Sequence, residues 1–130
     1  VEELGALFAA KDIDVATEEC AELDAPPTAS ARSFAASGGV ANAVKLRLKN
    51  PDILRAGIID GLDKDGMKKL AYYGKIQAGV LKPTDETPNL VEVMACQGGC
   101  IAGPCVVTNP KVAAVQLKKY VEAGVKPDQN

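Results

Sequence analysis

The sequence contains no histidine, and aromatic residues make up only 4% of its 130 residues. Without histidine, the chain can build neither an imidazole metal site nor a catalytic triad with histidine as its base. The formal net charge is −2, so the basic excess expected of a nucleic-acid-binding protein is absent. No apolar run approaches the roughly eighteen residues of a membrane span. Nucleic acid and membrane are therefore not expected partners, and the four cysteines become the main candidates for site chemistry.

The length and composition are typical of one globular domain. Apolar residues make up 47% of the chain and charged residues 25%, which predicts a domain large enough to bury a core. The first residues, Val1 to Leu4, lack an initiator methionine and the basic start of a signal peptide, so we expect an excised piece rather than a secreted precursor. Four cysteines without an evident pairing favour a reducing, cytoplasmic compartment.

Four stretches have the apolar spacing of amphipathic helices. They are residues 1–10, a stretch from Ser37 to Leu48, one that begins with an N-cap at Asp63, and one from Pro110 to about Ala123. Asn109 is the expected N-cap of the last helix and Gly124 its C-cap. The expected inward faces comprise Val40, Val44 and Leu48; Met67, Leu70, Ala71 and Gly74; and Ala114, Leu117 and Val121.

Two apolar runs predict buried strands near residues 54–60, with a start at Ile53, and near 89–94. Proline-bounded segments at 25–28 and 82–89 predict surface loops, and residues 125–130 should fray. This order of elements predicts an α/β fold in which helices flank a small parallel or mixed sheet. We expect residues 1–130 to form a single domain.

Three of the four cysteines lie in one glycine-rich turn after the second predicted strand. Cys96, Cys100 and Cys105 are separated by three and four residues. Interspersed glycines (Gly98, Gly99 and Gly103) can take positive φ and let the backbone approach a bulky group. Thiolates together with free backbone N–H groups suit an iron–sulfur cluster. Because ligands of parallel sheets bind beyond the carboxyl ends of strands, the turn is also where such a fold would hold a site.

Spacing alone leaves alternatives open. The turn could equally be a strand–turn–helix junction with small buried cysteines. A disulfide framework is disfavoured, because the chain consists mostly of amphipathic segments rather than loops that need cross-links. Cys20 lies in an acidic run, Glu18 to Glu22, which we interpret as a solvated helix turn with a structural or free thiol.

The amino-acid sequence of the turn is more specific than the spacing of its cysteines. Residues Glu92 to Cys100 read EVMACQGGC, which resembles the third cysteine signature of iron-only hydrogenases, EVMAC-x-GGC. The resemblance implies that Cys96 ligates the four-iron cubane (4Fe-4S) of the H-cluster, and that Cys100 bridges the cubane to the two-iron subcluster. It also implies that Met94 packs beside the two-iron site, with Gly98 and Gly99 close to the cofactor. Cys100 and Met94 are thus the implied catalytic residues.

Two other features bear on this resemblance. Residues 34–40, with Ser37, Gly38 and Gly39 at their centre, resemble the hydrogenase segment Phe-Gly-x-Ser/Thr-Gly-Gly-Val, which implies that their backbone approaches the cluster. The alternative is that these glycines only permit tight strand–helix packing. The chain departs from the signature at Gln97, where proline is common. Cys105 has no counterpart in it, and is either a spare thiol or a further ligand in a divergent, sensory branch.

The chain carries only part of the cluster's ligand set. Iron-only hydrogenases have further cluster cysteines in upstream signatures of the types TSCCP and PCxxK, and neither occurs here. The resemblance therefore implies the C-terminal lobe of a hydrogenase large subunit. Its partners would be the upstream lobe of the same polypeptide and a ferredoxin-like electron carrier. The whole protein would interconvert protons and H2, and we expect the isolated piece to be inactive. Whether this piece holds iron by itself or binds no cofactor stays open at this point. The alternatives are a non-catalytic iron–sulfur redox sensor and a cluster-free interaction domain.

Overall fold

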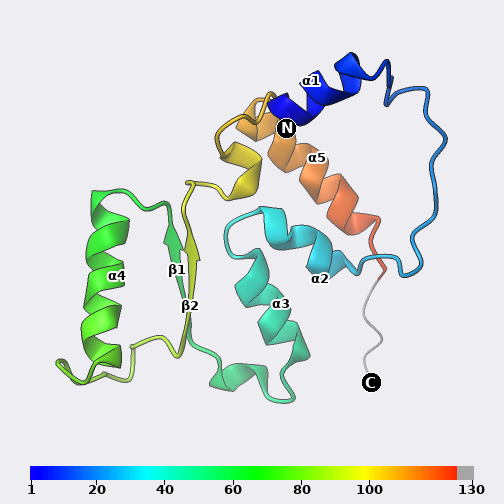
Figure 1. Cartoon of the computed structure of the whole chain (residues 1–130). Coiled ribbons are helices and arrows are strands. Elements are labelled where there is room, and N and C mark those ends of the chain that lie inside the picture. Colours follow the sequence, from blue (N-terminus) through cyan, green and yellow to red (C-terminus); the bar gives the residue numbers. More distant parts are fainter. Residues whose placement is uncertain (126–130) are drawn as a thin grey trace.

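The computed structural model describes residues 1–125 and is an α/β structure (Figure 1). The element order is α1 (Glu2–Ala10), α2 (Ala29–Arg32), η1 (Ser33–Ala35), α3 (Gly39–Arg47), η2 (Pro51–Ile53), β1 (Ala56–Asp60), α4 (Lys64–Gln77), β2 (Leu90–Met94), η3 (Cys100–Ala102) and α5 (Pro110–Glu122), where η denotes a 3-10 turn. The predicted α/β class is confirmed. The predicted fraying of residues 125–130 lies outside the described residues, except at Val125, whose carbonyl accepts a hydrogen bond from the Ala29 N–H at 2.9 Å.

The two strands form a parallel sheet in which Ile58 is paired with Glu92 and Asp60 with Met94. Helix α4 packs against β1, and α3 packs against β2, so the helices flank the sheet (Figure 1). The prediction that the first strand starts at Ile53 is wrong. The Asn50 side chain accepts a hydrogen bond from the Asp52 N–H, which closes the 3-10 turn η2 before the strand can begin.

Helix α4 begins as predicted but turns a different face to the sheet. Asp63 Oδ1 accepts hydrogen bonds from the N–H groups of Asp65 (3.1 Å) and Gly66 (2.8 Å), which is an N-cap. The expected inward position of Met67 is wrong, because its side chain is 51% exposed. Gly66 is buried against Ile59 instead. A residue without a side chain allows α4 to approach β1 closely, and this contact sets the rotation of the helix.

Helix α5 packs on α2, on the side of the sheet away from α4 (Figure 1). Leu117 and Val121 are half-buried, as predicted, whereas Ala114 is exposed because Ala113 faces inward in its place. The C-cap is Ala123, one residue before the predicted Gly124. Gly124 does not need a positive φ. Glycine is needed there because a Cβ atom would come within 2.7 Å of the Ala29 backbone.

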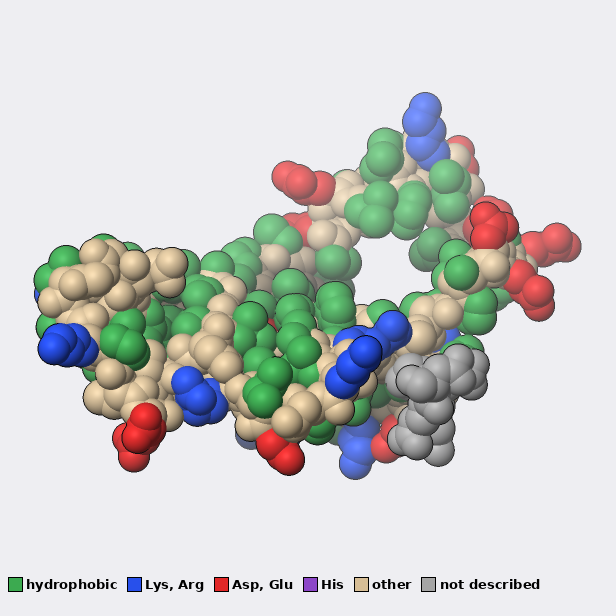
Figure 2. Space-filling view, turned by 90° about the horizontal axis from the view of Figure 1, so that it is seen from below, with side chains coloured by type: hydrophobic (Ala, Val, Ile, Leu, Met, Phe, Trp, Pro, Cys, Tyr) green, Lys and Arg blue, Asp and Glu red, His purple; other side chains and the backbone are tan. Residues whose placement is uncertain are grey.

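The expectation of a substantial core is wrong for the described residues. Among residues 1–125, the buried apolar side chains are Ala41 and Ile59, with exposed fractions of 4% and 2%. Large apolar side chains on both strands and on α1, α3 and α4 are exposed, and Figure 2 shows hydrophobic groups over much of the visible face. A two-stranded sheet offers too little area to cover these side chains. None of the helices in residues 1–125 is long and apolar enough to cross a membrane.

Candidate functional site

The cysteine turn lies at the carboxyl ends of both strands. It follows β2 directly, and the end of β1 is tied to it by backbone and side-chain bonds. The Gly61 N–H donates to the Met94 carbonyl at 3.0 Å, and the Gly98 N–H donates to Asp60 Oδ1 at 2.7 Å. A carboxylate that follows one strand therefore holds the turn that follows the other. The position is the one at which parallel sheets bind their ligands.

Two glycines determine the path of the turn. Gly98 and Gly99 have φ values of 82° and 85°, which residues other than glycine rarely adopt. Gly99 also pairs with Ala36 in an isolated antiparallel bridge. A Cβ atom on Gly99 would lie 2.6 Å from the Ala35 carbonyl oxygen and 2.7 Å from the Ser37 nitrogen. The structure thus brings the cysteine turn into backbone contact with the second glycine-rich segment, at Ser37.

The cysteines differ in exposure. Cys96 is half-buried, and its sulfur lies over Gly103, where a Cβ atom would be 3.4 Å from it. Cys100 and Cys105 are exposed, and all four thiols are free. Cys20 is also exposed and lies in coil between α1 and α2, so the predicted helix turn there is wrong. Residues 11–26 are all exposed, so no buried face stabilises a helix there.

Ser37 has an unusual hydroxyl group. Its Oγ atom is buried and has no hydrogen-bond partner among the described residues. Gly38, the next residue, is the N-cap of α3 with φ 87°, so the predicted helix start is confirmed. Burying an unpaired hydroxyl costs about 1–3 kcal/mol. Such a group in a native protein normally meets a water or a ligand.

Glu92 is the site residue that the sequence interpretation missed. It is the single charged residue of β2, yet it is only 8% exposed. Its Oε1 accepts a hydrogen bond from the Gly38 N–H at 2.9 Å, and its Oε2 accepts one from the Ala41 N–H at 2.7 Å. A single charged residue within an otherwise apolar strand was the available signal, because a buried charge needs a specific partner.

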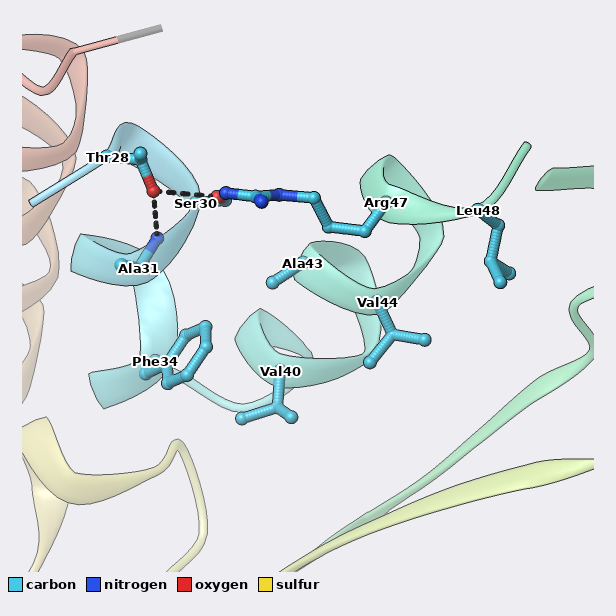
Figure 3. A pocket seen from close by; sticks show the side chains of 9 residues that line it. All are labelled: Thr28, Ser30, Ala31, Phe34, Val40, Ala43, Val44, Arg47 and Leu48. Carbon is cyan, nitrogen blue, oxygen red and sulfur yellow. Dashed lines mark hydrogen bonds between the residues drawn. The ribbon is translucent and has the colours of Figure 1, made fainter. Parts of the chain in front are cut away.

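An apolar pocket lies outside this site, between α2 and α3 (Figure 3). Its volume is about 370 Å³, and no cysteine lines it. Val40, Val44 and Leu48, which the helical spacing placed on one face, all line it together with Phe34. Polar groups come from Arg47 and from the bonded hydroxyls of Thr28 and Ser30. The predicted apolar face of α3 therefore exists, but it is open rather than packed in a core.

The donor set of the cysteine turn fits part of an iron–sulfur cluster. A cubane takes four thiolates, and the turn offers Cys96 and Cys100 together with the glycine backbone of Gly98 and Gly99. Within the described part of the chain, no three Cys, Asp or Glu side chains converge as a metal-binding group. The residues fit half of a cubane's ligand set.

A family model matches most of the chain. The family model described as iron only hydrogenase large subunit, C-terminal domain, matches residues 1–104 of the 130. No curated protein matches the chain significantly. The matched range contains Cys96 and Cys100 and ends immediately before Cys105, while α5 lies beyond it. This confirms the resemblance that the EVMACQGGC motif indicated: the chain belongs to the family of the iron-only hydrogenase large subunit, C-terminal domain.

Proposed function

We propose that this chain is the C-terminal lobe of an iron-only hydrogenase catalytic domain and supplies two thiolates to an H-cluster shared with an upstream lobe. The observation that carries the proposal is the position of the cysteine turn. Cys96 and Cys100 lie beyond the carboxyl ends of a parallel sheet, within a segment that the family model covers. The second glycine-rich segment, at Ser37, contacts the same turn. Membership of the family supports this type of cofactor.

Each residue has a role in this proposal. Cys96 would ligate the 4Fe-4S cubane, Cys100 would bridge it to the two-iron subcluster, and Met94, half-buried at the end of β2, would pack beside that subcluster. When bound, the H-cluster supplies the redox chemistry that interconverts protons, electrons and H2. The chain itself holds the two sulfurs in place through the Asp60–Gly98 bond and the bridge at Gly99. The Ser37 segment would approach the cluster through its backbone, because the Ser37 hydroxyl is itself buried within the chain.

The exposed apolar surface supports a second lobe as partner. Ile58 and Val93 on the strands, and Phe34 and Val40 at the pocket, remain 38–46% exposed. An upstream lobe of the same polypeptide would remove this apolar area from water and bring the missing ligands. Electrons would come from a ferredoxin-like carrier. The four free thiols agree with a reducing, cytoplasmic compartment.

One observation favours a second candidate, a non-catalytic iron–sulfur redox sensor. Cys105 is the third thiol of the same turn. It is exposed and has φ 64°, a left-handed conformation that is rare for residues other than glycine. Such backbone outliers cluster at functional sites. In a sensor, Cys105 would act as a ligand in place of an upstream cysteine.

Differential alkylation distinguishes these functions. We expect Cys96 and Cys100 to be protected from iodoacetamide in the cluster-loaded protein that contains both lobes, because a thiolate bound to iron is not free to react. Cys20 and Cys105 should react at the rate of exposed thiols and serve as controls. Cys96, Cys100 and Cys105 share one tryptic peptide, so tandem mass spectrometry, whose fragment ions separate the three cysteines, gives the four rates. Protection that includes Cys105 would instead indicate the sensor, and reaction at all four cysteines would indicate a cluster-free interaction domain.

A further inference from the structure

Glu92 replaces a helix cap that α3 lacks. The N-cap residue of α3 is Gly38, which has no side chain to accept a hydrogen bond from the first turn. In a capping box, the N–H groups of the N-cap and N3 residues are satisfied by side chains of those same two positions. Here these N–H groups belong to Gly38 and Ala41, and both donate to Glu92 on β2. The Glu92 carboxylate thus accepts both hydrogen bonds that the N-cap and N3 side chains accept in a capping box.

The arrangement is favourable for physical reasons. Among residues 1–125, Glu92 is the one buried charged side chain, and it lies where the helix dipole places partial positive charge. Both carboxylate oxygens have a donor, at 2.9 and 2.7 Å, in the range of charge-assisted bonds. A neutral side chain of equal length cannot reproduce this, since an amide offers one acceptor oxygen and a donor NH2 group.

The hydrogen bonds of Glu92 with Gly38 and Ala41 hold the start of α3 and also restrain the segment around Ser37. Ala36 is paired with Gly99 of the cysteine turn, and Gly38 is bonded to Glu92. Ser37 lies between these two fixed points. Glu92 itself is on the strand that leads into Cys96, so the segment around Ser37 is attached to the cysteine turn at one end and to its supporting strand at the other.

We infer that Glu92 is a positioning residue that sets where Ser37 and the start of α3 stand relative to Cys96 and Cys100. It touches no ligand itself and acts through the Gly38 and Ala41 amides. Only the last consequence of this inference, its effect on a bound cluster, rests on the proposed function. The effect on the two amides depends on the chain alone.

The test compares Glu92→Gln with Glu86→Gln, a change of the same kind at an exposed loop position. In Glu92→Gln we expect amide hydrogen exchange at Gly38 and Ala41 to accelerate on the order of tenfold or more, because bonds to a charged group are lost. The Gly66 amide, capped by Asp63 at 2.8 Å, is an internal reference and should not change. Unchanged exchange at Gly38 and Ala41 would overturn the inference.

Two further measurements keep the inference testable. If Glu92→Gln fails to fold, trans-hydrogen-bond couplings in the unmodified chain, from the Glu92 side-chain carboxyl carbon to the Gly38 and Ala41 nitrogens, provide the test, and their absence overturns it. In the cluster-loaded protein with both lobes, Glu92→Gln should shift the EPR g-values while Glu86→Gln leaves them unchanged; an identical spectrum in both variants contradicts positioning. A failure of the proposed function looks different: no cluster forms in any variant, while the amide effects persist.

Discussion

Replacing Gly99 with alanine is expected to destabilise the chain by about 2–6 kcal/mol and to separate the cysteine turn from the Ser37 segment. Gly99 has φ 85° and ψ −164°, a backbone region that costs residues other than glycine about 1–3 kcal/mol, and overpacking adds about 1–3 kcal/mol. The added methyl group would lie 2.6 Å from the Ala35 carbonyl oxygen and 2.7 Å from the Ser37 nitrogen. Both neighbours are backbone atoms, which cannot rotate away as a side chain can.

Gly98→Ala is the matched control for this substitution. Gly98 has nearly the same φ, 82°, but its Cβ atom would meet only the Ala102 methyl group, at 3.3 Å. We therefore expect a loss of about 1–2 kcal/mol, from backbone strain alone. Urea denaturation of both variants gives the two free energies of unfolding. Equal losses would contradict the close approach of the Ser37 segment to Gly99.

Cys96→Ser and Cys100→Ser are each expected to abolish cluster binding in the protein with both lobes. Removing even an outer partner of a metal ligand lowers affinity about 10–100-fold, so loss of the ligand itself should cost more. Cys105→Ser and Cys20→Ser should retain the iron content of the unmodified protein, since neither thiol lies within the proposed ligand pair.

Iron analysis and EPR after anaerobic reconstitution measure this effect. Serine is close to cysteine in size, so the four variants differ mainly in whether a sulfur ligand is lost. Thermal unfolding of the apo variants should be similar, which separates ligation from folding. If Cys105→Ser loses as much iron as Cys100→Ser, the assignment of two ligands to this chain is wrong and a sensor-type site is favoured.

The sequence correctly predicted those helix starts that depend on hydrogen bonds between residues close together in the chain. Asp63 and Asn109 were recognised as N-caps because the side chain and the amides that it satisfies are two or three residues apart. The rotation of α4 could not be predicted in the same way. It depends on Gly66 lying against Ile59 of another element, and apolar spacing placed Met67 inward instead. The strand start at Ile53 was wrong because the Asn50 side chain closes a turn there.

The candidate site was predictable in its cysteines but not in its supports. The motif and its glycines are contiguous in sequence, so the turn and its resemblance to a known signature could be recognised directly. The supporting carboxylates act over long separations: Glu92 lies 54 residues from Gly38, and Asp60 lies 38 residues from Gly98. The residues next to Glu92 or Asp60 in the sequence do not indicate which distant backbone N–H group will donate a hydrogen bond to its carboxylate.

Composition was a poor guide to the core. Apolar residues make up 47% of the sequence, yet few of their side chains are buried in residues 1–125. Burial depends on how many layers of structure are available to cover an apolar face, which composition does not specify. The exposed strand residues Ile58 and Val93 are explained in the proposal by a covering lobe that brings further elements.

The central claim is that this chain supplies half of a shared ligand set, and iron–sulfur reconstitution with and without a partner lobe tests it most directly. The 130-residue chain is expressed alone and together with the upstream lobe of an iron-only hydrogenase, and iron content and EPR are measured anaerobically. We predict no cubane signal and no H2 evolution from the chain alone, and a cubane that requires Cys96 and Cys100 when both lobes are present. A cubane on the chain alone that is lost in Cys96→Ser, Cys100→Ser and Cys105→Ser would contradict the claim.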